Sequence, residues 1–178
     1  MLVSGALVLA LLAADPPPPH GISLGIGAVS YVSFFSGSPA RAGLDLAYEH
    51  GLPRWLLRAG LRATLPGERT PVPAELYVQL QLSAAIGAWE PAIGPELGVS
   101  GLTGLGLLRP PLPPDLNEIE QLRVSPFYLA VAAAPLRFRL GRFALSALEL
   151  HWGPTLVPPG AAGRFHLGFL RVTVGFAP

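Results

Sequence analysis

Four histidines and the carboxylates near them are the side chains of this sequence with the most obvious chemical potential. The histidines are scattered, and no spacing between them matches that of a metal site. Glu149 and His151 lie two residues apart in an alternating segment, so a strand would place them on one face and Ser146 on the other. We interpret Glu149 and His151 as a structural polar pair, and we expect no metal and no cofactor. The four histidines are His20, His50, His151 and His166.

Sequence motifs of common enzymes are not found. There is no phosphate-binding loop, no zinc-protease helix motif and no nucleophile elbow. Gly21, Gly25 and Gly27 look like a dinucleotide-binding pattern, but they lie inside an alternating segment and not between a strand and a helix. The absence of cysteine excludes disulfides, thiol nucleophiles and cysteine-based metal sites. We therefore predict a protein that is not an enzyme.

Three arginines recur every four residues in "RWLLRAGLRATL", residues 54–65. This spacing keeps Arg54, Arg58 and Arg62 on one face of a helix and equally on one face of a strand. As a helix the segment would be basic and amphipathic, suited to a membrane surface or an acidic partner. A glycine inside the segment weakens a helix, prolines bracket it, and its neighbours alternate, so we predict a strand.

The composition is unusual for a soluble protein of 178 residues. The chain is 51% hydrophobic and 13% charged, against a usual charged share of about 25%, and its mean hydropathy is +0.48. Part of the surface is therefore expected to face something other than water. The net charge of +1, with acids interspersed among the arginines, argues against nucleic acid as a partner.

The N-terminus predicts export. "MLVSGALVLALLAAD" contains a short apolar run that ends in small residues, as a secretory signal peptide does, although no basic residue precedes it. The run is too short to span a bilayer, which takes about 20 apolar residues. We expect a signal peptide at 1–14, a proline-rich spacer at 15–21 and a single domain at 22–178.

Eight segments after the spacer alternate between apolar residues and polar or small ones, as strands do. The clearest is "ELYVQLQLSAAIGAW", which sets leucine, valine and isoleucine on one parity and glutamate, tyrosine and glutamine on the other. Pro135 predicts a bulge or a frayed end inside the sixth segment. The segments are residues 21–34, 42–50, 54–65, 75–89, 92–106, 125–138, 142–153 and 164–176.

The connections between these segments alternate between long and short. Four residues at 50–53, four at 89–92 and three at 140–142 form the short ones. The long connection at 107–123 contains "DLNEIEQLR", in which a helical turn or two is expected. Short turns at one rim and longer loops at the other are typical of single-chain outer-membrane barrels.

The choice of inward face decides between a soluble barrel and a membrane barrel. The polar parity is rich in glycine, alanine and serine, which suits the crowded inside of an eight-stranded barrel. We therefore predict that the polar parity points inward, where buried charges must pair. The predicted interior network is Asp45, Glu49, Arg58, Arg62, Glu96, Glu149, His151 and Arg171.

Aromatic residues cluster near the ends of the predicted strands, and most of them fall at the short-turn rim. Such rings form girdles at the two interfaces of a membrane barrel. The predicted interfacial aromatics are Tyr48, Trp55, Trp89, Phe138, Phe143, Trp152 and Phe176.

In pattern, residues 22–176 resemble the small eight-stranded outer-membrane β-barrels of Gram-negative bacteria, of the type of the outer-membrane protein A transmembrane domain. The final segment "RVTVGF" is similar to the C-terminal strand of those proteins, except that Ala177 and Pro178 follow Phe176. The resemblance implies an all-β, antiparallel, up-and-down transmembrane barrel located in the bacterial outer membrane. Its implied partners are the lipid bilayer, lipopolysaccharide and the outer-membrane assembly machinery.

Three functional hypotheses follow. The first is an outer-membrane barrel with a charge-paired interior, acting in envelope structure or through its longer loops, or as a narrow pore. The second is a secreted soluble lipocalin-like barrel, which would bind a small apolar ligand and point its leucine parity inward. The third is a lipid-modifying outer-membrane enzyme using Glu149 or His151; the His-x-Ser arrangement of such enzymes is missing.

Overall fold

The computed structural model describes residues 20–32, 40–65, 74–100, 127–154 and 163–176. The expected signal peptide, the helical turn near 115–123 and the long connections lie outside these residues. Within the described ranges, no helical span has the length and apolarity that crossing a bilayer requires.

All regular structure in the described residues is β-strand. The first strand begins at His20, two residues before the expected start of the domain. The strands are β1 (His20–Val32), β2 (Arg41–Gly51), β3 (Trp55–Thr64), β4 (Ala74–Ser83), β5 (Ala92–Ser100), β6 (Phe127–Ala134), β7 (Arg137–Leu140), β8 (Phe143–Ser146), β9 (Glu149–Pro154) and β10 (Gly163–Phe176).

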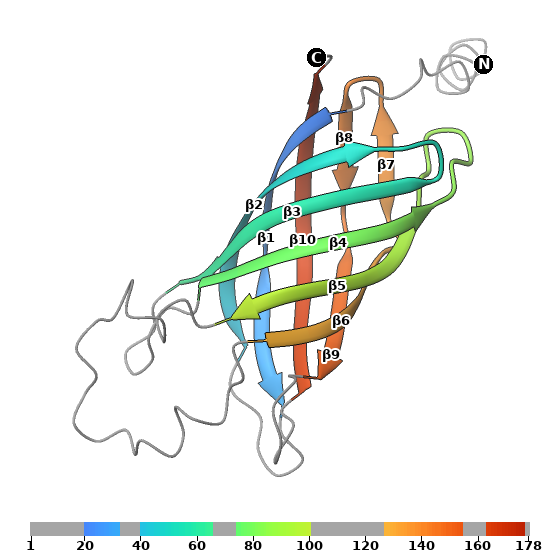
Figure 1. Ribbon diagram of the computed structural model, residues 1–178. Helices are drawn as coiled ribbons and strands as arrows, with labels where there is room; N and C mark the ends of the chain where they lie inside the picture. Colours follow the sequence, from blue (N-terminus) through green and yellow to red (C-terminus); the bar gives the residue numbers. More distant parts are fainter. Residues whose placement is uncertain (1–19, 33–39, 66–73, 101–126, 155–162, 177–178) are drawn as a thin grey trace, which may run out of the picture.

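Antiparallel pairing closes these strands into a barrel. β1 to β6 pair in chain order, β6 pairs with β9, β9 pairs with β10, and β10 pairs back with β1. β7 continues the line of β6 and pairs with β8, which in turn pairs with β10 (Figure 1). β6 with β7, and β8 with β9, are therefore two halves of single barrel strands. The predicted eight-stranded, up-and-down antiparallel barrel is confirmed.

Alternation along the strands sorts side chains onto two faces of opposite chemistry. In β3, Arg58 and Arg62 are 0% and 1% exposed, whereas Leu57 and Leu61 are 37% and 42% exposed. The same pattern holds in β4, with buried glutamine between exposed leucines. The polar parity points inward and the leucine parity outward, which contradicts the arrangement that a soluble ligand-binding barrel requires.

The apolar outer band has the height of a membrane. From Phe165 to Phe176, β10 advances eleven residues, which at about 3.3 Å per residue and a tilt of about 45° spans roughly 26 Å. An apolar band on a transmembrane barrel is about 25 Å tall. Exposed apolar surface on this scale in a water-soluble monomer would promote aggregation.

Three adjacent barrel strands change the parity of their inward residues at one height. The barrel strand formed by β6 and β7 is interrupted after Ala134, at Pro135, where a bulge or a frayed end was predicted. Arg137 is the next buried residue. β10 shifts its register against β1 between Ile26 and Gly27. Extra residues of this kind bend a strand and increase its local twist.

The interruption between β8 and β9 overturns one prediction. Ser146 was expected to face away from Glu149 and His151, but all three are buried, at 2%, 2% and 1% exposure. Strict alternation fails because Ala147 and Leu148 lie between two buried residues where one residue would preserve the period of two. Ser146 therefore belongs to the interior.

The turns at one rim are short and well defined. The β7–β8 hairpin turns at Gly141, whose φ is 61°, within the predicted connection 140–142. The β4–β5 turn was misplaced: β4 ends at Ser83, and the chain reverses at Gly87, also with φ of 61°, between the bridged residues Ile86 and Trp89. Because a positive φ favours glycine, the turn forms at Gly87, which precedes the predicted connection at 89–92.

Two tyrosines fill the space that two glycines leave inside the barrel. A Cβ at Gly98 would lie 2.2 Å from Cζ of Tyr128, and one at Gly60 would lie 2.6 Å from the hydroxyl of Tyr77. Each tyrosine ring therefore lies against the backbone of the paired strand, where no side chain can be added. Together with Ala47 and Ala130, these rings form the small apolar cluster of the interior.

We predict that Gly98→Ala destabilises the barrel, because the added methyl overlaps the Tyr128 ring and overpacking of this kind costs about 1–3 kcal/mol. Gly43→Ala is the matched control, since its Cβ would meet nothing closer than 3.3 Å. Urea unfolding in detergent micelles measures both. Equal midpoints for the two variants would refute the assigned packing.

Candidate functional site

The barrel interior contains a continuous network of buried charges, supplied by strands from around the whole barrel. In the described residues the buried carboxylates are Asp45, Glu49, Glu75, Glu90, Glu96 and Glu149, and the buried arginines are Arg58, Arg62, Arg137 and Arg171. Arg139, whose side chain is 17% exposed, and His151 are also paired with these carboxylates. All eight residues predicted for the network lie in it.

Arg58 joins opposite walls of the barrel. Its Nη2 lies 2.9 Å from Oε1 of Glu49 on the adjacent strand, and its Nη1 lies 3.1 Å from Oε1 of Glu149 on β9. Nη1 also donates to Oε1 of Gln79 at 3.1 Å. A guanidinium presents several donors in one plane, so it can link three acceptors on three strands.

Arg62 is the second hub, two inward positions further along β3. Its Nε lies 3.0 Å from Oδ2 of Asp45, and its Nη1 lies 3.3 Å from Oε2 of Glu75 and 3.4 Å from Oε1 of Glu96. The guanidinium also lies 4.5 Å above the ring centroid of Tyr77, whose hydroxyl donates to Asp45 at 2.6 Å. One arginine thus neutralises charge from β2, β4 and β5.

Arg171 ties the last strand to the first two. Its Nη2 lies 3.0 Å from Oδ2 of Asp45, and its Nε lies 2.9 Å from Oε2 of Glu149. Its Nη1 donates to Oγ of Ser23 on β1 at 3.0 Å. Asp45 therefore lies between Arg62 and Arg171, and the seam between β1 and β10 is bridged inside the barrel by side chains as well as by backbone.

Glu96 accepts hydrogen bonds from several sides. The hydroxyl of Tyr128 donates to its Oε1 at 2.8 Å, and Nε2 of Gln79 donates to its Oε2. Nδ1 of His151 lies 2.5 Å from the same Oε2, while Nε2 of His151 lies 3.8 Å from Oε2 of Glu149. Glu149 and His151 are thus members of the network, and neither faces the outer surface.

A further group near the short-turn rim was not anticipated. Nη2 of Arg137 lies 3.0 Å from Oε2 of Glu49, and its Nε lies 3.3 Å from Oε2 of Glu90. Arg139 meets the other oxygen of Glu90 at 2.6 Å. Glu90 was assigned to a turn, and the arginines follow the interruption at Pro135, so unbroken alternation could not place them. Glu75 was also missed, although its position on the inward parity of β4 would have placed it in the network.

The interior is filled by its own side chains. Arg58, Arg62 and Arg171 are 2% exposed or less, and Glu96 is not exposed at all. Charges that deep remain ionised only with close partners, which the network supplies. The described interior is therefore a packed ionic core.

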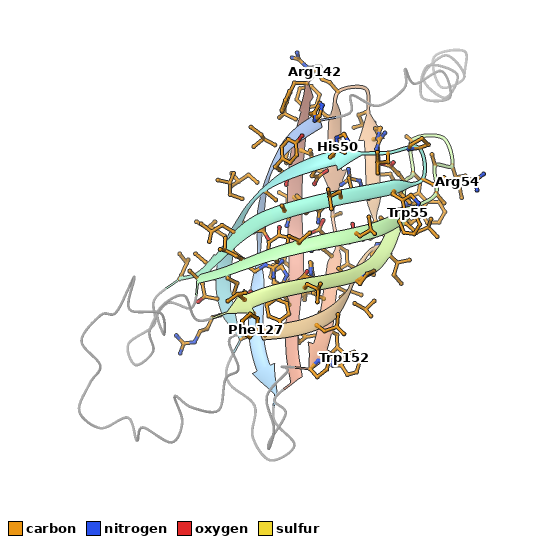
Figure 2. The ribbon with its side chains drawn as sticks, in the orientation of Figure 1. His50, Arg54, Trp55, Phe127, Arg142 and Trp152 are labelled. Atoms are coloured by element: carbon orange, nitrogen blue, oxygen red, sulfur yellow. The ribbon has the colours of Figure 1, made fainter. Side chains whose placement is uncertain are left out.

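The aromatic residues lie at both rims of the outer face. Tyr48, Trp55, Trp89, Phe143 and Phe176 are 40–43% exposed at the short-turn rim, and Phe138 lies with them on β7. Trp152 and Phe127 lie toward the opposite rim (Figure 2). Nε1 of Trp89 donates to the carbonyl of Pro135 at 2.7 Å, so this indole caps the interruption between β6 and β7.

The four histidines of the sequence lie in two pairs. His151 lies 4.6 Å from His166 between ring centroids inside the barrel, and His20 lies 4.9 Å from His50 at the short-turn rim. In the described residues no group of three or more potential ligands could hold a metal ion.

A closed eight-stranded barrel with an ionic core, an apolar outer band and aromatic rims has the architecture of the small outer-membrane β-barrels. The structure of Neisserial surface protein A is similar to this chain, with a TM-score of 0.63, 7% sequence identity, and coverage of 89% of this chain and 97% of that one. At this identity the likeness concerns the fold. No protein-family model and no curated protein matches the sequence.

We predict that Arg62→Leu lowers the free energy of unfolding by about 3–5 kcal/mol, because it leaves three buried carboxylates without their shared partner. Arg54→Leu is the matched control, since Arg54 belongs to the same arginine series but is exposed at the rim (Figure 2). Urea titration of the refolded protein in micelles compares the two. Unchanged stability of Arg62→Leu would refute the pairing.

Proposed function

We propose that this chain is an outer-membrane β-barrel of a Gram-negative bacterium, exported by its N-terminal signal, and that it acts in envelope structure or through its longer loops. The observation that carries the proposal is the reversed sorting of the faces, with leucines outward and arginines inward. The likeness to Neisserial surface protein A in fold supports it.

The lipid bilayer and lipopolysaccharide are the surroundings that such an outer band suits. In this orientation the short turns face the periplasm and the longer connections face outward. The outer-membrane assembly machinery is the proposed partner in biogenesis, and the closing strand β10, ending at Phe176, is the segment proposed for its recognition.

The mature protein, refolded in detergent, is expected to show β-rich circular dichroism and a heat-modifiable mobility on gels. Cell fractionation is expected to recover it with the outer membrane, in the detergent-soluble fraction. Recovery in the periplasm or medium without detergent would overturn the proposal and favour a secreted barrel.

A non-conducting barrel is favoured over a narrow pore because the charged residues of the interior are paired with one another. Arg58, Arg62 and Arg171 each bridge at least two carboxylates across the lumen. An ion would have to separate these pairs, and each separation leaves charges buried without a partner.

Planar-bilayer recordings of the refolded protein are therefore expected to show no stepwise conductance. Heat-modifiable mobility of the same preparation is the control that the barrel has folded. Reproducible unitary steps from folded protein would contradict a closed interior and support the pore.

We also propose that the chain is not an enzyme. Glu149 and His151 are the residues considered for lipid modification, and both are buried inside the barrel at 2% and 1% exposure. A lipid substrate in the bilayer meets the outer face, where neither side chain is available to it.

A further inference from the structure

The outer face of β2 to β6 is hollowed by an apolar groove that neither the ionic core nor the aromatic rims explain. Its volume is about 910 Å³, and its lining is almost entirely apolar. It lies on the outward parity, so a membrane placement would put it against lipid and not against water.

The floor of the groove is one row of paired residues that crosses five strands. Ala47, Gly60, Tyr77, Gly98 and Tyr128 are successive partners in this row, and their side chains point into the barrel. The two glycines contribute no side chain, so the backbone itself forms much of the floor.

The walls are the outward side chains on either side of that row. One wall contains Leu46, Leu61 and Leu76, and the other contains Tyr48, Ala59, Val78 and Leu97. Ala59 is the smallest side chain of the second wall, and it lies between Tyr48 and Val78 in the ladder.

The direction and length of the groove suit a hydrocarbon chain. In a barrel whose strands all tilt by about 45°, a row perpendicular to β3–β5 rises at about 45° to the barrel axis. Four strand spacings of about 4.8 Å between β2 and β6 give roughly 19 Å along this row, which corresponds to roughly 14 Å of height. One leaflet of a bilayer contributes about 15 Å of hydrocarbon.

The end of the groove at Tyr48 carries groups that suit a phosphate. The hydroxyl of Tyr48 is hydrogen-bonded to Nδ1 of His20, and the His20 ring lies 4.9 Å from the ring of His50. His20 and Arg142 also line a small hollow beside this point. The carboxylate nearby, Glu49, is already bonded to Arg58 and Arg137, so its charge is compensated at this rim.

We propose that the groove binds one phospholipid, with an acyl chain along the row from Ala47 to Tyr128 and the phosphate at His20 and His50. This inference rests on the proposed membrane placement. It differs from general solvation by the bilayer, because a lipid held by both ends remains with the protein when the surrounding lipid is replaced by detergent.

Native mass spectrometry of the refolded protein, given a few equivalents of palmitoyl-oleoyl phosphatidylglycerol in detergent, tests the proposal. The unmodified chain is expected to retain one phospholipid. Ala59→Trp fills the groove and is expected to reduce retention by at least about tenfold. Ala63→Trp is the control, since Ala63 is also outward on β3 but outside the groove.

A second arm tests the headgroup end. His20→Phe combined with His50→Phe keeps aromatic rings at the rim but removes the imidazole donors, and retention is expected to fall roughly tenfold. Equal retention by all variants would overturn the proposal. A dimer that forms in the unmodified chain and is lost in Ala59→Trp would instead assign the groove to a second copy.

Heat-modifiable mobility and insertion into phosphatidylcholine vesicles separate the two levels of inference. Variants that insert normally while the unmodified chain retains no phospholipid refute the lipid site alone. Failure of the unmodified chain to insert at all refutes the membrane placement on which the site rests.

Discussion

The pairing of β1 with β10 is the interaction on which the other features of this protein depend. It satisfies the backbone groups that an open sheet would leave at its edges, a requirement in lipid, where water cannot replace a missing partner. Closure also divides the side chains into those inside and those outside. Once that division exists, leucines on one parity form an outer band, and every charge on the other parity must find its partner within a small enclosed volume.

That enclosed volume explains the composition of the interior. Arginine suits it because one planar guanidinium can reach carboxylates on several strands, as Arg62 does with Asp45, Glu75 and Glu96. Tyrosine hydroxyls and a glutamine amide donate hydrogen bonds to the same carboxylates. Glycine opposite tyrosine keeps the walls close enough for these contacts. Small and charged residues are thus two parts of one packing solution, because a narrow lumen holds long side chains only where neighbouring positions are nearly empty.

Alternation with a period of two was enough to predict the barrel, the inward face and the central arginines. It failed where the period is interrupted: Ser146 was placed outside, Arg137 and Arg139 were not assigned to the network, and Glu90 was taken for part of a turn. These residues lie next to the interruptions near Pro135 and Ala147 or pair across from them. An extra residue reverses the face that every later residue of the strand occupies, so an argument from alternation assigns the wrong face there. Nor could sequence alone match arginines to individual carboxylates, since partners such as Arg58 and Glu149 are brought together only by closure.

The seam between the first and last strands also has a kinetic consequence. Arg171 bonds to Ser23 across 148 residues of chain, and the backbone ladder beside it joins the same distant segments. Contacts so remote in sequence form slowly, because the entropy of closing the intervening chain is lost before any bond is gained. The core therefore remains incomplete, with Asp45 and Glu149 lacking the guanidinium of Arg171, until β10 has paired with β1. Closure of the barrel and completion of its electrostatic core are the same event.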